Sequence, residues 1–172
     1  MGTLCKLTVG WIAPLCLVAA VFTMVPDLSH ADGYGNSLKG VKGISAVFDV
    51  SLADPKMANI VFWAVKNVYE ESDVKALSGK PAVAVVFHGG AVKLLSSDKM
   101  LFSKEQWPEV EKFQQTLRKM KADGVNLEVC MYAVKVVGVD TKTLMPEIDQ
   151  VGNGFVSVVG YQMQGYGVVR IP

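Results

Sequence analysis

The chain has 172 residues, of which 51% are hydrophobic, and its 17 basic and 16 acidic side chains give a net charge of +1. This length suits one domain with an adequate core behind a short N-terminal segment. The near-neutral charge gives no electrostatic reason to expect nucleic acid or an anionic membrane surface as a partner.

The N-terminal segment has the features of an export signal. Residues 7–25 are almost wholly apolar, and Ser29-His30-Ala31 places small residues at both positions that a signal peptidase reads. We therefore expect residues 1–31 to be a signal peptide, residues 32–40 a flexible leader and residues 41–172 the folded domain. The mature protein would be periplasmic or secreted, without stable membrane association. An uncleaved anchor is the alternative, because the apolar segment approaches the length of a membrane span.

Cleavage after Ala31 would leave a single cysteine, Cys130, and a single histidine, His88. One cysteine cannot form an internal disulfide, and this count excludes a zinc site built from several Cys and His ligands. The chain also has no G-x-G-x-x-G after its first strand, no G-K-S/T phosphate loop and no G-x-S-x-G elbow. We therefore expect neither a metal nor an organic cofactor.

Strands and helices alternate along the first half of the domain. Residues 44–50 predict a strand, and Asp54-Pro55 then predicts the start of a helix that runs to about Glu71. Residues 81–87 are apolar without alternation, which is typical of a strand buried on both faces. The apolar face of the helix is predicted from residues at helical spacing, widened by two aromatic side chains: Met57, Ile60, Val61, Ala64, Val65 and Val68, with Phe62 and Trp63.

The second half continues the alternation. After a short helical piece at residues 91–96, Ser103 to Gln106 matches a capping box that opens an amphipathic helix ending at Ala122, before Gly124. The remaining segments are predicted as follows: a strand at 125–130, a short helix at 131–137, a loop with one helical turn at 140–150, a helix at 153–162 and a strand at 166–171. The β-branched residues of 153–162 fit a strand nearly as well.

This alternation predicts a three-layer α/β/α domain with a mostly parallel sheet of about five strands, joined by right-handed crossovers. Open sheets of this kind bind their ligands in the crevice at the carboxyl ends of the strands. Cys130 stands where a strand ends and a helix begins, and the helix dipole there favours thiolate over thiol. A buried, inert cysteine is the alternative, because cysteine often serves as a small hydrophobe.

Two further candidates follow the first and second strands. If the second and third strands are neighbours, His88 lies at the same edge of the sheet as Cys130 and can take its proton or stabilise its anion. Satisfying local backbone groups is an equally good interpretation of His88. Asp49 could orient His88, but an aspartate close to Cys130 would oppose ionisation of the thiol. A turn or capping role is therefore favoured for Asp49.

Three residues are candidates for binding at the same rim. Gly89 follows His88 directly, and Tyr132 and Lys135 lie on the short helix after Cys130. Lys135 would favour a thiolate if its side chain points inward, although a lysine on a short helix is usually solvated.

Five segments follow one another in a recognisable order: Phe48-Asp49-Val50, the Pro55 helix with Asn67, Val85-Val86-Phe87-His88-Gly89, Val129-Cys130 and Gln162-Met163-Gln164-Gly165-Tyr166. Their order resembles the DsrE/DsrF-like family over residues 41–171. The resemblance implies a DsrE-like fold, assembly into a homo-oligomer such as a dimer, trimer or hexamer and, in some members, a cysteine that relays sulfur as a persulfide. Cys130 occupies the matching position, which implies a sulfur donor or acceptor protein as a partner.

Two functions of different classes are therefore expected. In the first, Cys130 accepts, stores or transfers sulfane sulfur, or exchanges disulfides with a partner. In the second, the protein is a non-catalytic oligomeric module that binds a small ligand or a partner, and Cys130 is buried and structural.

Overall fold

The computed structural model describes residue 2 and residues 33–172 of the chain. The predicted signal peptide and its cleavage site therefore lie outside the described residues, apart from Gly2. Residues 33–40, expected as a flexible leader, form a run of turns in which the Leu38 N–H donates to the Tyr34 carbonyl at 2.8 Å. In the described part of the chain, no helix is both long and apolar enough to cross a membrane.

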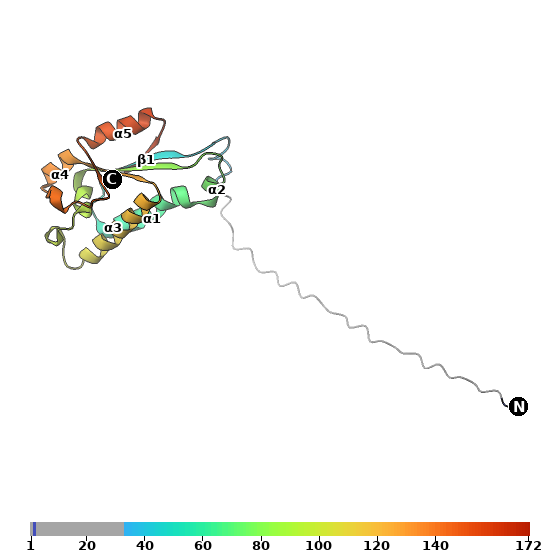
Figure 1. The fold of residues 1–172 in the computed structure, drawn as a ribbon, viewed down its shortest axis with the longest axis horizontal. Coiled ribbons are helices and arrows are strands. Elements are labelled where there is room, and N and C mark those ends of the chain that lie inside the picture. Colours follow the sequence, from blue (N-terminus) through green and yellow to red (C-terminus); the bar gives the residue numbers. More distant parts are fainter. Residues whose placement is uncertain (1, 3–32) are drawn as a thin grey trace. The chain divides into compact units, whose positions relative to one another are not determined.

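Five parallel strands form one sheet in the order β4-β3-β2-β1-β5 (Figure 1). The prediction of an α/β fold around a mostly parallel sheet of about five strands is confirmed. The unbroken apolar run of β2 is buried from Val83 to Phe87, as a central strand covered on both faces requires. The strands are β1 (Ser45–Val50), β2 (Ala82–Phe87), β3 (Asn126–Cys130), β4 (Asp149–Val151) and β5 (Gly167–Ile171).

Helices cover the two faces of the sheet unequally (Figure 1). One face packs against α1 (Pro55–Glu70), α3 (Trp107–Ala122), α4 (Met131–Val137) and the 3₁₀ helix η1 (Gly89–Leu95), whereas α5 (Gly154–Met163) covers the other. The crossovers explain this division. The chain advances from β1 to β4 in one direction and then returns to place β5 beside β1, so a right-handed return has to run over the opposite face. The remaining short elements are α2 (Ser72–Lys75), η2 (Lys99–Leu101) and η3 (Thr141–Thr143).

The larger core lies between the sheet and α1 and α3. Phe62 is fully buried at its centre, with its ring centroid 4.7 Å from that of Phe113 and 5.8 Å from that of Phe87. The predicted apolar face of α1 is partly wrong, because Met57 and Ile60 are about half exposed and lie outside this core. Two apolar stripes overlap on α1, and the stripe that contains Phe62 packs against the sheet.

Polar side chains form the hydrogen bonds that the sequence predicts near two helix starts. The Asp54 carboxylate accepts a first-turn N–H of α1 at 2.7 Å. Ser103 and Gln106 form the reciprocal hydrogen bonds of a capping box at 3.2 and 3.1 Å, but this box lies in the turn before α3, which begins at Trp107 and not at Glu105. The Asn153 side chain accepts from the Phe155 N–H at 3.0 Å at the start of α5. Residues 153–162 therefore belong to a helix, and their β-branched residues do not make a strand.

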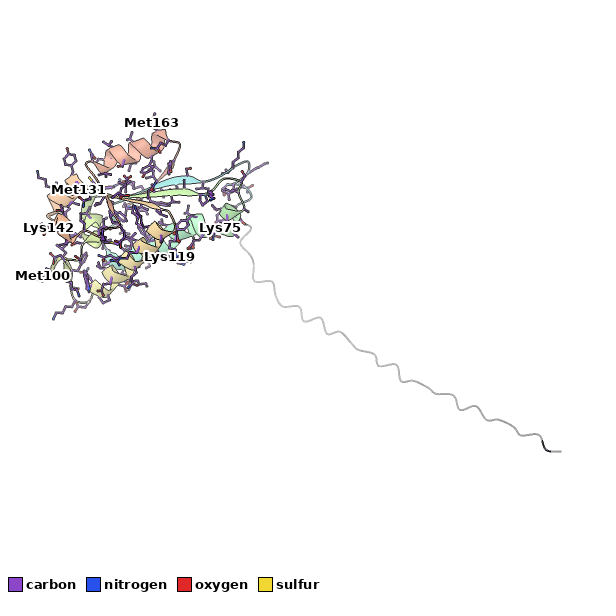
Figure 2. All side chains as sticks on the ribbon, in the orientation of Figure 1. Lys75, Met100, Lys119, Met131, Lys142 and Met163 are labelled. Carbon is purple, nitrogen blue, oxygen red and sulfur yellow. The ribbon has the colours of Figure 1, made fainter. Side chains whose placement is uncertain are left out.

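The second core, beneath α5, is small. It consists of four buried residues, Val47, Ala84, Val86 and Val158, with two tyrosines packed against them. Much of α5 remains uncovered by its own chain, and Met163 projects from it away from the sheet with 84% of its surface exposed (Figure 2). The α5 face of the sheet is therefore a thin layer with an apolar outer surface.

Candidate functional site

The carboxyl ends of β5, β1, β2 and β3 place a row of polar side chains under the start of α5. Residues paired in parallel strands point to the same face of the sheet, and Asp49 pairs both with Arg170 and with Val86 of the small core. Phe87 pairs with Val129, so His88 and Cys130 come next in the same register. The expectation that β2 and β3 are neighbours, with His88 and Cys130 at one edge, is confirmed.

Cys130 ends β3 and is the N-cap residue of α4. It is a free cysteine with 6% of its surface exposed, and its side chain makes no capping hydrogen bond. The start of α5 lies against it, because a Cβ on Gly154 would be 2.9 Å from the Cys130 Cβ and 3.6 Å from Sγ. Cys130 therefore lies at the start of α4 and against the start of α5.

His88, Asp49 and Arg170 form a polar chain across the carboxyl ends of β2, β1 and β5, in which His88 and Asp49 are buried. His88 Nε2 is hydrogen-bonded to Asp49 Oδ1, and Arg170 Nη1 donates to Asp49 Oδ2 at 2.7 Å. His88 is 8% exposed and Asp49 is 7% exposed, whereas 57% of the Arg170 side chain is exposed. The turn or capping role that the sequence favours for Asp49 is not observed, because both carboxylate oxygens bind side chains of the neighbouring strands.

The imidazole of His88 lies under α5. Its ring centroid is 5.4 Å from that of Phe155, in the first turn of the helix. Its side chain binds a carboxylate and not the local backbone groups that the alternative interpretation invoked. Within residues 33–172, no hydrogen bond joins His88 to Cys130, so the two side chains share one rim without bonding directly.

The other predicted site residues lie at the margins. Gly89 has a φ of +52°, a left-handed conformation that lets the chain turn from His88 into η1, so its role here is conformational. Tyr132 is 64% exposed on α4, and its backbone N–H donates to the Gly152 carbonyl at 3.3 Å. Lys135 is also exposed on α4. Neither side chain bonds to the His88–Asp49 pair.

Three residues of this site are absent from the sequence prediction: Arg170, Gly154 and Phe155. Arg170 does leave a signal in the sequence, since it is the one charged residue of β5 and Asp49 is the one charged residue of β1. Opposite charges in two apolar strands suggest a cross-strand pair. Gly154 and Phe155 leave no such signal, because their importance depends on where α5 crosses the sheet.

A side-chain hydrogen bond joins α5 to β3. The Tyr161 hydroxyl donates to Glu128 Oε1 at 2.7 Å, and the other carboxylate oxygen of Glu128 is buried without a partner among the described residues. Burial and the hydrogen bond to Glu128 raise the pKa of Tyr161 above its ordinary value. Glu128 lies on the same face of β3 as Cys130, two residues earlier. Tyr161 therefore anchors the helix whose first turn covers the thiol.

The site is a covered rim and not an open cleft. A hollow of about 380 Å³ on the surface lies elsewhere and is lined by residues that include Tyr34, Trp63 and Val74. In the part of the chain that the structure describes, no three His, Cys, Asp or Glu side chains are grouped so that they could hold a metal ion.

Comparisons with known proteins agree with this fold. The chain is similar in structure to protein MTH1491 of Methanobacterium thermoautotrophicum, described as a protein of unknown function, with 20% identity, a TM-score of 0.57 and coverage of 74% of this chain and 98% of that one. It is also similar to the ychN protein of E. coli, with 14% identity, a TM-score of 0.52 and coverage of 76% and 99%. No curated protein gives a significant match. The model of the DsrE/DsrF-like family matches residues 46–171, and the chain belongs to this family.

Proposed function

We propose that this protein handles sulfur through Cys130, which takes up sulfane sulfur as a persulfide and passes it to an acceptor thiol. The observation that carries the proposal is the position of Cys130 at the carboxyl end of β3, against the first turns of both α4 and α5. Partial positive charge from two helix starts stabilises an anionic sulfur at this point. Family membership supports the same chemistry.

The transfer is a thiolate exchange that needs no added oxidant. The Cys130 thiolate attacks the outer sulfur of a donor persulfide, R–S–SH, and forms a Cys130–S–SH persulfide. The S–S bond of the donor breaks, and its electron pair leaves with the R–S⁻ thiolate. An acceptor thiolate reverses these steps, attacks the outer sulfur on Cys130 and releases the Cys130 thiolate. Sulfur moves at one oxidation level, so atoms and electrons balance at each step.

His88 is proposed to take up the proton of the Cys130 thiol. It lies at the same rim, next in register to Cys130, and its Nε2 is occupied by Asp49. Because Cys130 is 6% exposed, a donor reaches its sulfur when the first turn of α5 moves away from it.

The alternative function is a non-catalytic oligomeric module that binds a small ligand or a partner. Burial of Cys130 and the lack of a hydrogen bond to His88 favour it, since a structural cysteine shows both properties. In this case Cys130 contributes packing between β3 and α5, and the rim has no thiol chemistry.

Self-association and export are also proposed. Phe155, Val156 and Val159 are each more than half exposed on α5, and apolar patches of this kind mark interfaces between chains. A homo-oligomer would cover them. The apolar segment at residues 7–25 and the small residues before Asp32 support export to the periplasm or outside the cell.

Intact-mass measurement tests the sulfur proposal. The reduced protein is incubated with a low-molecular-weight persulfide, and Cys130 should gain the mass of one or more sulfur atoms, which a dithiol then removes. Cys130→Ser should remove the adduct and keep the fold, because serine nearly preserves the side-chain volume. Cys5→Ser/Cys16→Ser is the matched control where the full chain is used. A native protein that gains no sulfur, while its denatured form is alkylated normally, would support the binding module instead.

A further inference from the structure

We propose that Arg170 is a positioning residue that acts through Asp49 on His88. The guanidinium balances the charge of the buried carboxylate, so that His88 stays neutral, with its proton on Nε2 and a free lone pair on Nδ1. This proposal deepens the proposed sulfur transfer and rests on it for the role of His88, but its structural part can be tested without any sulfur donor.

The inference depends on the two different partners of the Asp49 carboxylate oxygens. One oxygen binds His88 Nε2 and the other accepts from Arg170 Nη1 at 2.7 Å, so each oxygen has one partner from a different neighbouring strand. β1 is the strand that lies between β2 and β5, and Asp49 is its one charged residue, on the α5 face. A carboxylate buried at 7% exposure needs partners of this kind to remain charged.

The charges that face His88 decide its protonation. Asp49 contributes a carboxylate from β1, and Arg170 of β5 places a guanidinium on the other oxygen of that carboxylate. Cys130 of β3 lies next in register at the same rim, and Phe155 in the first turn of α5 carries no charge. Without Arg170, the imidazole would be the only side-chain partner of the buried Asp49 carboxylate among residues 33–172, and that negative charge favours an imidazolium. An imidazolium has a proton on both nitrogens and cannot accept one from a thiol.

A purely structural role for Arg170 is less well supported. The backbone ladder already holds β5 to β1 over five residue pairs, from Ala46–Gly167 to Val50–Ile171. The Arg170 side chain is 57% exposed, so it adds little to the packing of the core. Beyond the backbone ladder, Arg170 supplies a positive charge beside Asp49 Oδ2.

Nitrogen-15 NMR of the imidazole in the full-length protein tests the proposal. At neutral pH we expect wild-type His88 to have one protonated nitrogen, Nε2, and Arg170→Gln to have both nitrogens protonated. Arg170→Lys keeps the positive charge and should restore the neutral ring. Signals are assigned with His88→Gln, because the chain has a second histidine, His30.

Two further variants separate the proposed mechanism from a general loss of structure. Arg118→Gln removes a guanidinium of similar exposure that pairs with Glu147, at 3.2 Å, and should leave His88 unchanged. In the double variant Asp49→Asn/Arg170→Gln, the carboxylate is gone and His88 should again be neutral. That return to neutrality is expected only if Arg170 acts through Asp49. A doubly protonated His88 in the double variant, or a neutral one in Arg170→Gln, would overturn the proposal.

Sulfur uptake gives the functional test. Transfer from a low-molecular-weight persulfide to Cys130 should be at least roughly tenfold slower in Arg170→Gln and near normal in Arg170→Lys, because general-base assistance is lost in the first variant and retained in the second. If the NMR result holds and Cys130 takes up no sulfur, the sulfur proposal fails while the positioning role remains. If Arg170→Gln does not fold, Asp49→Asn alone should give His88 a mixture of neutral tautomers, and a wild-type spectrum would reject the proposal.

Discussion

Gly154 lies so close to Cys130 that any side chain there would press on the thiol-bearing residue. A Cβ at this position would be 2.9 Å from the Cys130 Cβ and 3.1 Å from Val86 Cγ1. Glycine therefore lets α5 start directly on the carboxyl end of β3. The same contact keeps Cys130 covered, so one residue sets both the surroundings of the thiol and access to it.

Gly154→Ala is expected to lift the first turn of α5. Overpacking of this kind costs about 1–3 kcal/mol of unfolding free energy, which urea denaturation would measure. Alkylation of Cys130 in the native protein should become faster. Gly160→Ala is the matched control, because a Cβ there meets nothing within 4 Å, and it should stabilise the helix by about 0.5–1 kcal/mol. Slower alkylation in Gly154→Ala would contradict this account of the contact.

Tyr161→Phe should destabilise the protein near neutral pH and change its response to alkali. Loss of the hydroxyl leaves both oxygens of the partly buried Glu128 carboxylate without a partner, at a cost of about 1–3 kcal/mol. The raised pKa of Tyr161 means that the unfolded chain loses this proton at a lower pH than the folded protein does. Its contribution to stability is therefore complete below about pH 10, the ordinary value for tyrosine, and is lost as the pH rises further.

The measurement is urea unfolding from pH 7 to pH 11. Wild type should lose stability above about pH 10, and Tyr161→Phe should lose less over the same interval. Tyr34→Phe serves as the control, since Tyr34 is 45% exposed, and it should match wild type at every pH. Equal slopes for Tyr161→Phe and wild type would show that the hydroxyl is not held as the structure has it.

Much of this fold could be predicted from local sequence patterns. The apolar run of β2, the cap at Asp54 and the capping box at Ser103 each identify their element because a few neighbouring residues determine them. β4 is different. Its residues Asp149 and Gln150 are exposed at the sheet edge, so burial imposes no apolar pattern and a loop is the natural interpretation.

The site was only half predictable for a similar reason. Cys130 and His88 could be predicted because they stand at the ends of strands, and local sequence patterns reveal those ends. Arg170 and Phe155 reach the site because the last crossover returns over the opposite face and puts β5 beside β1. That reversal depends on the order of all five strands and not on any local pattern. The opposite charges suggest that Asp49 pairs with Arg170, but the sequence does not show that this pair lies beside His88.

Self-association is expected to involve the outer surface of α5. Met163→Glu places a charge on a side chain that is 84% exposed, and should weaken a homo-oligomer without affecting the fold of the subunit. Multi-angle light scattering would show a dimer, trimer or hexamer for wild type and a smaller mass for the variant. Met100→Glu is the control, because Met100 is 90% exposed in the η2 helix, away from α5. A wild-type monomer at micromolar concentration would remove the prediction.

Export should leave a mature N-terminus at Asp32. Intact-mass measurement of the exported protein would give the mass of residues 32–172, since Ser29 and Ala31 fit the small-residue requirement of a signal peptidase. Ala31→Leu should block cleavage because a bulky side chain does not enter the peptidase site. Recovery of the wild-type chain in the membrane fraction with Met1 attached would favour an anchor.

Access to Cys130 should depend on how firmly α5 is held by the small core. Val158 is the one residue of α5 in that core, and Val158→Ala removes two methyl groups at a cost of about 1–2 kcal/mol. If opening of α5 limits the reaction of the thiol, this variant should be alkylated roughly tenfold faster under native conditions, because 1.4 kcal/mol corresponds to a factor of ten in the open population. Val156→Ala makes the same chemical change at a position that is 69% exposed, and should leave the rate unchanged. Equal rates for both variants, with Val158→Ala less stable as expected, would mean that Cys130 is reached by a route that does not involve α5.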